Sequence, residues 1–185
     1  MNFESLFRAA TLLNKQHPET RFLVAAFSEA HKTTILDKIK NTNLPIEVHT
    51  KKTPEIMNLA YTCASVSGSV SLELLAAQTP SVIIFQTSPL MSIVARMLKN
   101  TPYITLVNLL AKKELFPERF GYYCSSNWVC DQLSEWVKFP EKRNALAQEL
   151  GVLKASIMSA GASKKGAIEI INFIENKKAQ AVSAA

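Results

Sequence analysis

The chain has 185 residues, of which 48% are apolar and 19% are charged, and its net charge is +6. This composition is sufficient for one packed domain and excludes a disordered chain. The excess of Lys and Arg favours anionic partners, which include phosphate-bearing ligands, acidic membrane surfaces and nucleic acid, although many basic proteins carry such a charge without a partner of this kind.

The cysteine and histidine content bears on whether the chain forms disulfides or binds a metal. The chain has three cysteines without a C-x-x-C pair and three scattered histidines. The sequence therefore predicts neither a disulfide framework nor a metal site, and it suits a reducing cytoplasm. No apolar run approaches the ~18 residues that span a membrane. The first residues carry charge and lack the apolar core of a signal peptide, so we expect no export.

Helix and strand patterns alternate through the first two thirds of the chain, and the last third is helical. Apolar residues at helical spacing predict helices, and short apolar or alternating runs predict strands. In chain order we expect a helix at 3–13, a strand at 21–27, a helix at 28–41, a strand at 46–50, a helix at 53–63 with Thr53 as its N-cap, a strand and turn at 64–68, a helix at 69–78, a strand at 80–85, a helix at 88–100, a strand at 103–110, and helices at 126–137, 140–158 and 162–176.

This alternation predicts an α/β fold with a mainly parallel, doubly wound sheet of the Rossmann-like kind. The apolar run at 81–85 favours a strand that is covered on both faces. We expect a Rossmann-like domain at 1–138, helices at 139–178 that pack on it, and a flexible tail at 179–185. Ligands of such sheets bind beyond the carboxyl ends of the strands.

One candidate binding turn follows an expected strand. Gly68 lies among serines just before a helix, where it can take a positive φ and let a ligand approach the backbone. The serine hydroxyls and the free N–H groups of a helix start can bind a diphosphate. Glu73 lies in the first turn of the helix and could accept hydrogen bonds from a ribose diol. An ordinary capped helix with a solvent-facing Glu73 explains the same residues.

A second candidate constellation spans 99–118. Asn108 follows an apolar run, and Lys112 and Lys113 come soon after it. A side-chain amide at the end of a strand can bridge phosphate or sugar hydroxyls, and lysines neutralise phosphate. A loop amide followed by a solvated run of charge is an equal alternative.

Together, these segments resemble the lipid-A-disaccharide synthase family. The family's S-G-T-x-[ST]-L-E motif is matched by the run from Ser67 to Glu73, with Ser69 in place of Thr, and its P-x-V-V-x-Y motif is matched by 80–85. The longer family pattern that begins with S-P-L and ends with P-E is matched by Ser88-Pro89-Leu90, Ala95-Arg96, Leu98-Lys99, Tyr103-Ile104, 106–111, Glu114 and Pro117-Glu118. The order and spacing of these pieces are specific, and the strong match covers about a third of the chain.

The resemblance implies the donor half of a glycosyltransferase with two Rossmann-like domains. Such enzymes transfer 2,3-diacylglucosamine from UDP-2,3-diacylglucosamine to 2,3-diacylglucosamine 1-phosphate (lipid X), with inversion, and need no cofactor or metal. The residues that the resemblance assigns to donor binding are Ser67, Gly68, Ser69, Val70, Glu73, Arg96, Lys99 and Lys113, and it assigns a catalytic role to Asn108. Loss of Asn108 is expected to reduce turnover more than stability.

The resemblance also implies where the protein acts and with what. It implies a cytoplasmic protein at the inner face of the inner membrane, bound peripherally to anionic lipid, with a homodimer as a further expectation and no nucleic acid as partner. Two alternatives stay open. One is another UDP-sugar glycosyltransferase or epimerase of the same fold, and the other is a non-catalytic remnant that binds a nucleotide or a lipid.

The chain departs from the family pattern at several points. Val107 stands where the family has Pro, and Lys112 stands where it has Gly. The chain opens on a helix that follows the first strand in the family, so it looks like a fragment or one piece of a split enzyme. We expect the first strand, its G-S-R turn and the acceptor domain to belong to a missing N-terminal region or to an upstream polypeptide. The strand at 22–27 and the strand that ends near Ser67 should then expose unpaired edges. Alone, the chain is expected to be inactive and poorly stable.

Overall fold

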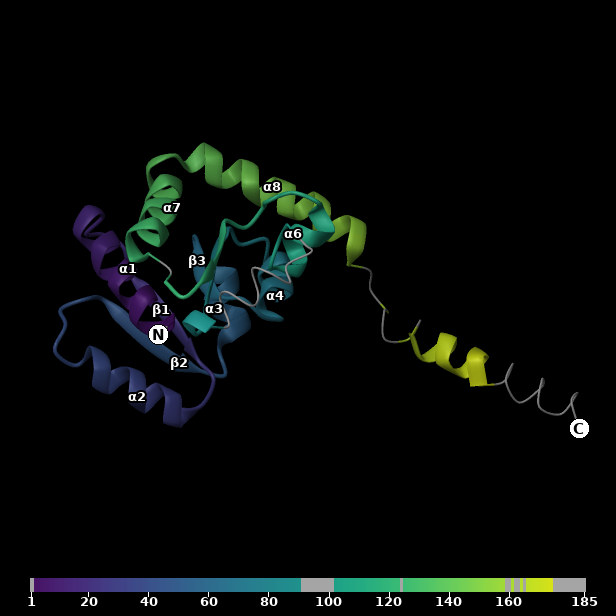
Figure 1. Ribbon diagram of the computed structural model, residues 1–185, viewed down its shortest axis with the longest axis horizontal. Helices are drawn as coiled ribbons and strands as arrows, with labels where there is room; N and C mark the ends of the chain where they lie inside the picture. The colour runs from purple at the N-terminus through teal and green to yellow at the C-terminus, as the bar shows by residue number, and fades with distance from the viewer. Residues whose placement is uncertain are drawn as a thin grey trace, which may run out of the picture.

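The computed structural model describes residues 2–90, 102–123, 125–158, 161, 164 and 166–174 (Figure 1). The expected helix at 88–100 and tail at 179–185 lie wholly or mostly outside these residues, as do Arg96 and Lys99. The elements in chain order are α1 (Asn2–Gln16), β1 (Phe22–Ala26), α2 (Glu29–Ile39), β2 (Ile46–Thr50), α3 (Thr53–Leu59), β3 (Cys63–Val66), α4 (Val70–Ala77), β4 (Ser81–Gln86), α6 (Leu106–Ala111), β5 (Glu118–Gly121), α7 (Ser126–Lys138) and α8 (Pro140–Ile157).

All described strand pairs are parallel, but the strands form two sheets. One sheet has the order β1-β2, with Phe22 opposite Ile46. The other has the order β3-β4-β5, in which Ser65, Ile83 and Glu118 lie at one level. Parallel strands joined through helices give the Rossmann-like α/β fold that the sequence predicts.

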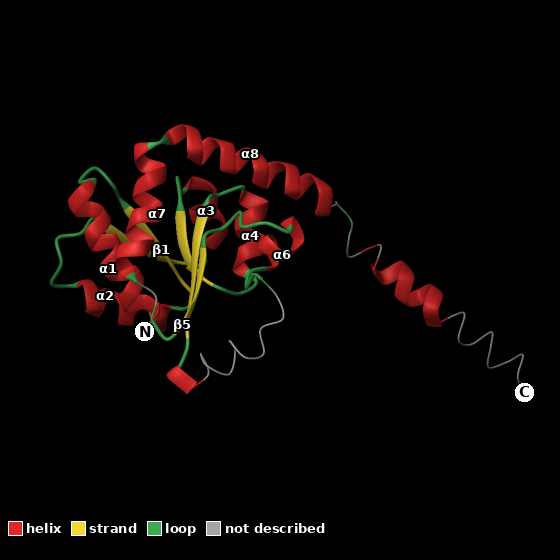
Figure 2. Ribbon diagram, turned by 45° about the horizontal axis from the view of Figure 1, so that its top comes forward, coloured by secondary structure: helices red, strands yellow, loops and turns green. Residues whose placement is uncertain are grey.

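Helices lie on both sides of the strands (Figure 2), and successive residues of β4 belong to two different cores. Val82 and Ile84 pack with α1 and α7 in one cluster, whereas Ile83 packs with residues of α3, α4 and α8 in the other. All three of these side chains are fully buried. This explains why 81–85 reads as a continuous apolar run, since a strand covered on both faces needs apolar residues at every position.

Between 103 and 121 one expected strand is wrong and one observed strand was not expected. Residues Leu106–Ala111 form helix α6 instead of a strand, because the side chain of Thr105 caps the helix by accepting the N–H of Asn108 at 3.3 Å. Glu118–Gly121 form strand β5, which was not expected because its four residues include two charges. The pairing of β5 with buried β4 overrides that weak local signal.

The N-cap expected at Thr53 is also wrong. Helix α3 begins at Thr53 itself, its cap position is Lys52, and no side chain caps it. Pro54 in the first turn sets the helical φ without needing a donor, so this helix starts without a capping hydroxyl. By contrast, Ser28 caps α2 by accepting the N–H of His31.

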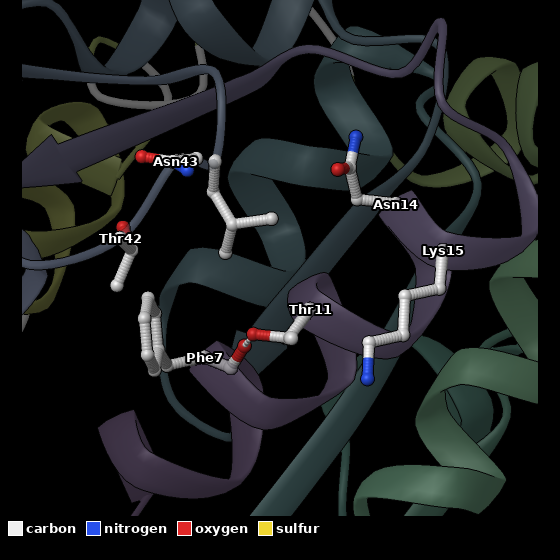
Figure 3. A pocket seen from close by; sticks show the side chains of 7 residues that line it. Phe7, Thr11, Asn14, Lys15, Thr42 and Asn43 are labelled. Carbon is white, nitrogen blue, oxygen red and sulfur yellow. Dashed lines mark hydrogen bonds between the residues drawn. The ribbon is translucent and has the colours of Figure 1, made fainter.

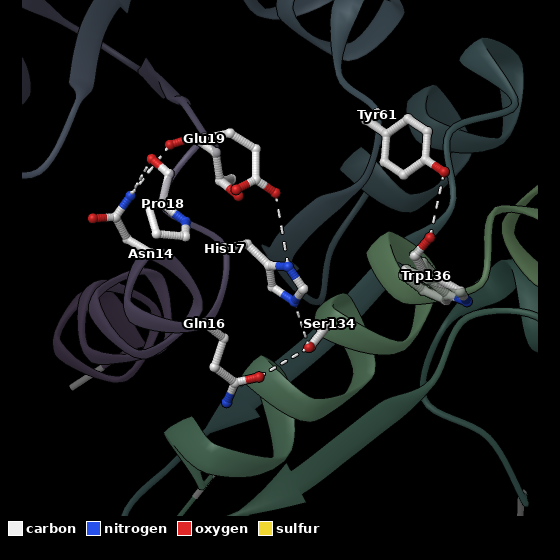
Figure 4. Close-up of polar contacts among 9 residues, drawn as sticks. Asn14, Gln16, His17, Pro18, Glu19, Tyr61, Ser134 and Trp136 are labelled. Carbon is white, nitrogen blue, oxygen red and sulfur yellow. Dashed lines mark hydrogen bonds and ion pairs between the residues drawn. The ribbon is translucent and has the colours of Figure 1, made fainter.

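The end of α1 is tied to α7 by a chain of hydrogen bonds (Figure 4). The Ser134 hydroxyl donates to Oε1 of Gln16 at 3.0 Å, and the same oxygen lies 2.8 Å from Nε2 of His17. With the hydroxyl proton directed at Gln16, this arrangement fits the tautomer of His17 in which Nε2 donates to the Ser134 oxygen. The contacts tie the end of α1 to α7.

Candidate functional site

The turn after β3 is open to solvent and holds the sequence-predicted donor residues together. Gly68 and Ser69 are exposed, and Ser67 and Val70 are partly buried. The N–H of Ser67 donates back to β4 at 2.9 Å, so the strand pairing ends at this residue. The chain then leaves the carboxyl edge of the sheet and enters α4 three residues later. This is the position where parallel α/β sheets bind ligands.

Backbone N–H groups at the start of α4 have no hydrogen-bond acceptor among the described residues. Its hydrogen bonds begin with the N–H of Ser71, which donates to the carbonyl of Gly68 at 3.2 Å, while the Ser71 hydroxyl donates to the same carbonyl at 3.0 Å. The amides of Gly68, Ser69 and Val70 precede this bond and, like the first amides of any helix, have no acceptor within it. No side chain caps α4. These three N–H groups can therefore receive an anion.

Gly68 keeps the backbone accessible, but the conformation of the turn does not require a glycine. Its φ does not lie in the left-handed region, contrary to the sequence expectation of a positive φ. A Cβ added at this position would meet no heavy atom within 4 Å. The side of Gly68 that a side chain would occupy is thus open space.

Glu73 lies one helical turn beyond Gly68. Its side chain is exposed, and it belongs to the first turn of α4, where a carboxylate is favoured by the helix dipole. Among the described residues it has no ion-pair partner. Its carboxylate is free to accept hydrogen bonds from a ligand that occupies the turn.

Asn108 lies in a different environment, because its side-chain amide makes all of its hydrogen bonds inside the protein. The residue is 0% exposed. Its Oδ1 accepts the N–H groups of Leu115 and Phe116 at 2.8 and 2.9 Å. Its Nδ2 donates to the Phe116 carbonyl at 2.8 Å and to the Glu118 carboxylate at 2.9 Å. An amide can make four such bonds, so contact with a ligand would require Asn108 to give one up.

Glu118 completes this cluster and was not singled out from the sequence. Besides the bond from Asn108, its carboxylate accepts the backbone N–H of Thr105 at 3.0 Å and that of Ile104. One side chain thereby holds the start of α6 against the start of β5. The signal that could have identified it is the acidic residue directly after Pro117, at the point where a new strand begins.

The sheet register gives the separation of the two candidate regions. Glu118 lies level with Ser65, two residues before Ser67 on β3. At the usual spacings this is about 7 Å along the strands and about 10 Å across them. No hydrogen bond among the described residues links the Asn108 cluster to the turn at 67–73. Asn108 is therefore tied to Glu118 on β5 and not to the turn by the described hydrogen bonds, and its role in ligand binding stays a prediction.

Two lysines of the second constellation, Lys112 and Lys113, belong to the described part of the chain. Lys113 pairs with Glu149 of α8 at 2.5 Å, and both side chains are about half exposed. Lys112 ends α6 with φ 55, in the left-handed region that favours glycine. The Gly-to-Lys departure noted in the sequence thus falls on a residue that adopts a glycine-like conformation.

The thiols of Cys63 and Cys130 are held in their neutral form. Burial raises the pKa of Cys63, at the start of β3, to about 11. Burial also raises the pKa of Cys130 on α7. Both are free thiols. Neither has the lowered pKa of a nucleophilic cysteine, so neither is a candidate for covalent catalysis.

A hollow of about 360 Å³ lies elsewhere, between the outer face of α1 and the loop before β2 (Figure 3). It is lined by Phe7, Thr11, Asn14, Lys15, Thr42, Asn43 and Leu44. None of the sequence-predicted site residues lines it. Within the described part of the chain, no group of three acidic, His or Cys side chains could hold a metal ion, and no helix there is long and apolar enough to cross a membrane.

Comparison with known proteins gives one consistent relationship. The family described as lipid-A-disaccharide synthetase matches residues 1–170. A lipid-A-disaccharide synthase of Neisseria meningitidis serogroup A is 31% identical over 80% of this chain and 39% of its own length. The Haemophilus influenzae Rd protein of the same name is 30% identical over 95% of this chain and 46% of its own. That of Syntrophus aciditrophicus is 25% identical over 92% and 45%. The chain spans less than half the length of these relatives.

Proposed function

The chain belongs to the lipid-A-disaccharide synthetase family, and from this membership we propose that it is the donor-binding part of a glycosyltransferase of lipid A biosynthesis. The observation that carries the proposal is the open turn at 67–70, where three backbone N–H groups at the start of α4 have no hydrogen-bond acceptor among the described residues and lie at the carboxyl edge of the sheet. Family membership supports a transferase. The identities of the donor and the acceptor, and the direction of transfer between them, are proposed here.

The proposed ligand of the turn is the diphosphate of a UDP-sugar. The amides of Gly68, Ser69 and Val70 donate to phosphate oxygens, and the hydroxyls of Ser67 and Ser69 add further donors. Glu73, one turn along α4, accepts from the ribose hydroxyls. When the acceptor hydroxyl attacks the anomeric carbon and gives its proton to a base, the sugar–phosphate bond breaks, and the departing UDP takes the bonding electrons and a growing negative charge. The same N–H groups stabilise this charge.

The other predicted residues have supporting roles in this proposal. Arg96, Lys99 and Lys113 supply positive potential for the donor. Asn108 remains a predicted contact of the donor, and its hydrogen bonding favours a positioning role, in which it holds the 105–118 segment beside the turn. UDP-2,3-diacylglucosamine and lipid X are the proposed substrates, and binding of the acceptor is assigned to a polypeptide region outside this chain.

Calorimetric titration with UDP tests the donor site directly. Gly68→Val inserts a side chain into the open space at this position, so UDP affinity should fall at least tenfold, which is about 1.4 kcal/mol. Gly166→Val is the matched control, because a Cβ there also meets nothing within 4 Å. The proposal fails if the full chain binds UDP equally well with either substitution, or does not bind UDP at all.

A UDP-release assay tests the reaction. The full chain is incubated with the diacylated donor and lipid X, with and without a candidate acceptor-binding polypeptide. Release should need that polypeptide and both sugars, and it should be lost in Gly68→Val but not in Gly166→Val. Release that does not depend on lipid X would indicate hydrolysis and would contradict the proposed transfer.

Peripheral binding to anionic lipid is proposed because the net charge is +6 and the proposed substrates are acylated. Each Lys or Arg near an acidic leaflet contributes ~1 kcal/mol, and salt screens the attraction. Flotation with phosphatidylglycerol vesicles should show binding at low salt that is lost at high salt. Absence of binding at low salt contradicts this part of the proposal, and binding that ignores salt points to apolar insertion instead.

A further inference from the structure

The hollow between α1 and the loop before β2 has no part in the proposed transfer. Its volume is about 360 Å³, which lies within the usual range of sites for small molecules, about 300–1,000 Å³. The loop that lines it leads into the amino end of β2, whereas the turn at 67–70 follows the carboxyl end of β3 in the other sheet. A ligand of the hollow would therefore occupy a site separate from the turn.

The wall of the hollow is mostly carbon, to which Phe7 and Leu44 contribute their apolar side chains (Figure 3). The Thr11 hydroxyl donates to the carbonyl of Phe7 at 3.0 Å. The Thr42 hydroxyl donates to the carbonyl of Ile39 at 2.9 Å. Both hydroxyls are thus paired within the protein, and the two threonines offer methyl groups to a ligand. A ligand that fills the hollow needs an apolar body, because a polar one would lose its hydrogen bonds with water.

Contacts one turn before Phe7 hold this wall in place. The ring of Phe7 stacks on that of Phe3, with the ring centroids 6.0 Å apart and the planes 9° from parallel. Lys38 of α2 lies over the Phe3 ring, 5.4 Å from its centroid, and pairs with Glu4 of α1 at 2.6 Å. Helices α1 and α2 are thereby joined beside the hollow. The site is formed before a ligand arrives, which lowers the entropic cost of binding.

A positive charge lies at one end of the hollow. Phe7, Thr11 and Lys15 follow one another at helical spacing, so they lie along one face of α1. The distance from Phe7 to Lys15 is ~12 Å along the helix axis. Of the described residues that line the hollow, only Lys15 is charged. Its ammonium has no hydrogen-bond or ion-pair partner among the residues that the structure describes. The α1 side of the hollow is thus apolar at one end and cationic at the other.

We propose that the hollow binds a free medium-chain fatty acid, with its chain along the apolar wall and its carboxylate beside Lys15. The chain replaces water at Phe7 and Leu44, so that apolar surface of both the ligand and the protein is buried. The carboxylate accepts a hydrogen bond from the Lys15 ammonium at the exposed end of the site. This inference depends neither on the proposed nucleotide nor on the proposed transfer.

Other small ligands match the hollow less well. A nucleoside diphosphate carries several charges and a polar sugar, whereas the described lining has one cation and is mostly carbon. A neutral alcohol of the same length would fill the apolar end but gain nothing from Lys15. A small inorganic anion would meet Lys15 without using the apolar wall, and one exposed lysine contributes little by itself. A fatty acid uses both ends of the site.

Methyl NMR on the full 185-residue chain tests the proposal, with decanoate as the probe, below the concentration at which it forms micelles. The methyl signals of Thr11, Thr42 and Leu44 should shift and saturate together. Ile170, which is 63% exposed, reports general association with apolar surface and should not follow them. Decanol should bind about 2- to 5-fold more weakly, and acetate should cause no shift. Absence of shifts at the three lining residues, equal shifts at Ile170, or equal affinity for decanol would overturn the proposal.

Substitutions test the two ends of the site separately. Lys15→Gln removes the charge, so it should weaken decanoate binding about 2- to 5-fold and leave decanol binding unchanged. Lys138→Gln is the matched control, because Lys138 is also an exposed lysine in the last turn of a helix. Asn43→Trp should fill the hollow and weaken binding of both ligands at least ~10-fold. If that variant loses its cooperative melt, Thr11→Phe fills the hollow from α1 instead. Unchanged decanoate affinity in Lys15→Gln, or in a filled variant that folds, contradicts the proposal.

Discussion

In the sequence, the turn at 67–70 and the Asn108 cluster look equally suited to a ligand. In the structure, the hydrogen-bonding groups of the turn are free, whereas those of the Asn108 side chain are all paired. The turn ends a strand, is exposed, and has three backbone N–H groups that donate to nothing within their helix. The Asn108 amide is 0% exposed, and its four hydrogen bonds are all made inside the protein.

This difference shows what a polar residue in a family motif can mean. A donor or acceptor that is unpaired and accessible is available for binding, whereas one that is paired and buried maintains the shape of its surroundings. Glu73 belongs to the first kind and Glu118 to the second, although both are acidic residues at the start of a secondary-structure element. Substitutions in the two regions test this distinction, and the effect on stability should be largest where buried groups lose their partners.

The largest effect is expected for Asn108→Ala. The substitution leaves the N–H groups of Leu115 and Phe116 and the Phe116 carbonyl without partners. Buried unpaired groups cost about 1–3 kcal/mol each, so the free energy of unfolding should fall by at least ~3 kcal/mol in chemical denaturation. Asn58→Ala is the control, because its amide makes one exposed bond to the Pro54 carbonyl. Equal losses for both variants would remove the distinction between the two regions.

The next effect concerns the strand that leads into the open turn. Burial raises the pKa of Cys63 from 9.0 to about 11, so its thiolate fraction at neutral pH should be ~100-fold below that of a free thiol. Alkylation by iodoacetamide, followed by peptide mass spectrometry, should be slower at Cys63 in the folded chain than in urea by about this factor. Equal rates would mean that the strand opens together with its turn.

The same shift gives a dependence of stability on pH. The unfolded chain loses the Cys63 proton near pH 9.0, whereas the folded chain keeps it up to about pH 11. The folded state therefore binds more protons in this window, and the free energy of unfolding should fall as the pH rises from 9 to 11. Cys63→Ala should remove this part of the slope.

A smaller gain is expected for Lys112→Gly. Lys112 ends α6 with φ 55, a conformation that costs a side-chain residue more than glycine. The substitution should raise the free energy of unfolding by about 0.5–1 kcal/mol. Glycine at Lys113, whose φ is not positive, should lower it instead. A loss at both positions would contradict the assignment of strain to Lys112.

The smallest effect is expected for Gly68→Ala. A Cβ there meets no atom within 4 Å and the φ is ordinary, so the melting temperature should stay close to that of the natural chain, with a change below ~0.5 kcal/mol. A clear loss of stability would show that the turn needs glycine for its own conformation, as the sequence suggested.

The sequence was informative where local and tertiary signals agree. β2 has the expected bounds, 46–50, because it is a short alternating run with clear breakers around it. The run at 81–85 predicted a strand covered on both faces, and both cores are built on it. The turn at 67–70 was located because glycine and serine before an apolar helix are a local pattern.

The parts that could not be predicted depend on distant partners. Residues Leu106–Ala111 are apolar in a way that suits a strand, and a carboxylate from β5, ten or more residues later, holds the helix start. β5 itself is a strand only because β4 lies beside it. The state of Asn108 follows from both. Its amide identity was visible in the sequence, but its four partners become known only when the loop before β5 is placed.

The tie between α1 and α7 has a consequence for the order of events during synthesis. His17 and Ser134 are 117 positions apart in the chain, so a ribosome that adds ~5–20 residues per second makes α7 roughly 6–23 s after α1. During that interval the side of α1 that carries Ala9 and Leu13 has no α7 to cover it. Helix α1 therefore emerges well before the helix that covers this side, and a delay in translation between the two helices lengthens its exposure to chaperones and proteases.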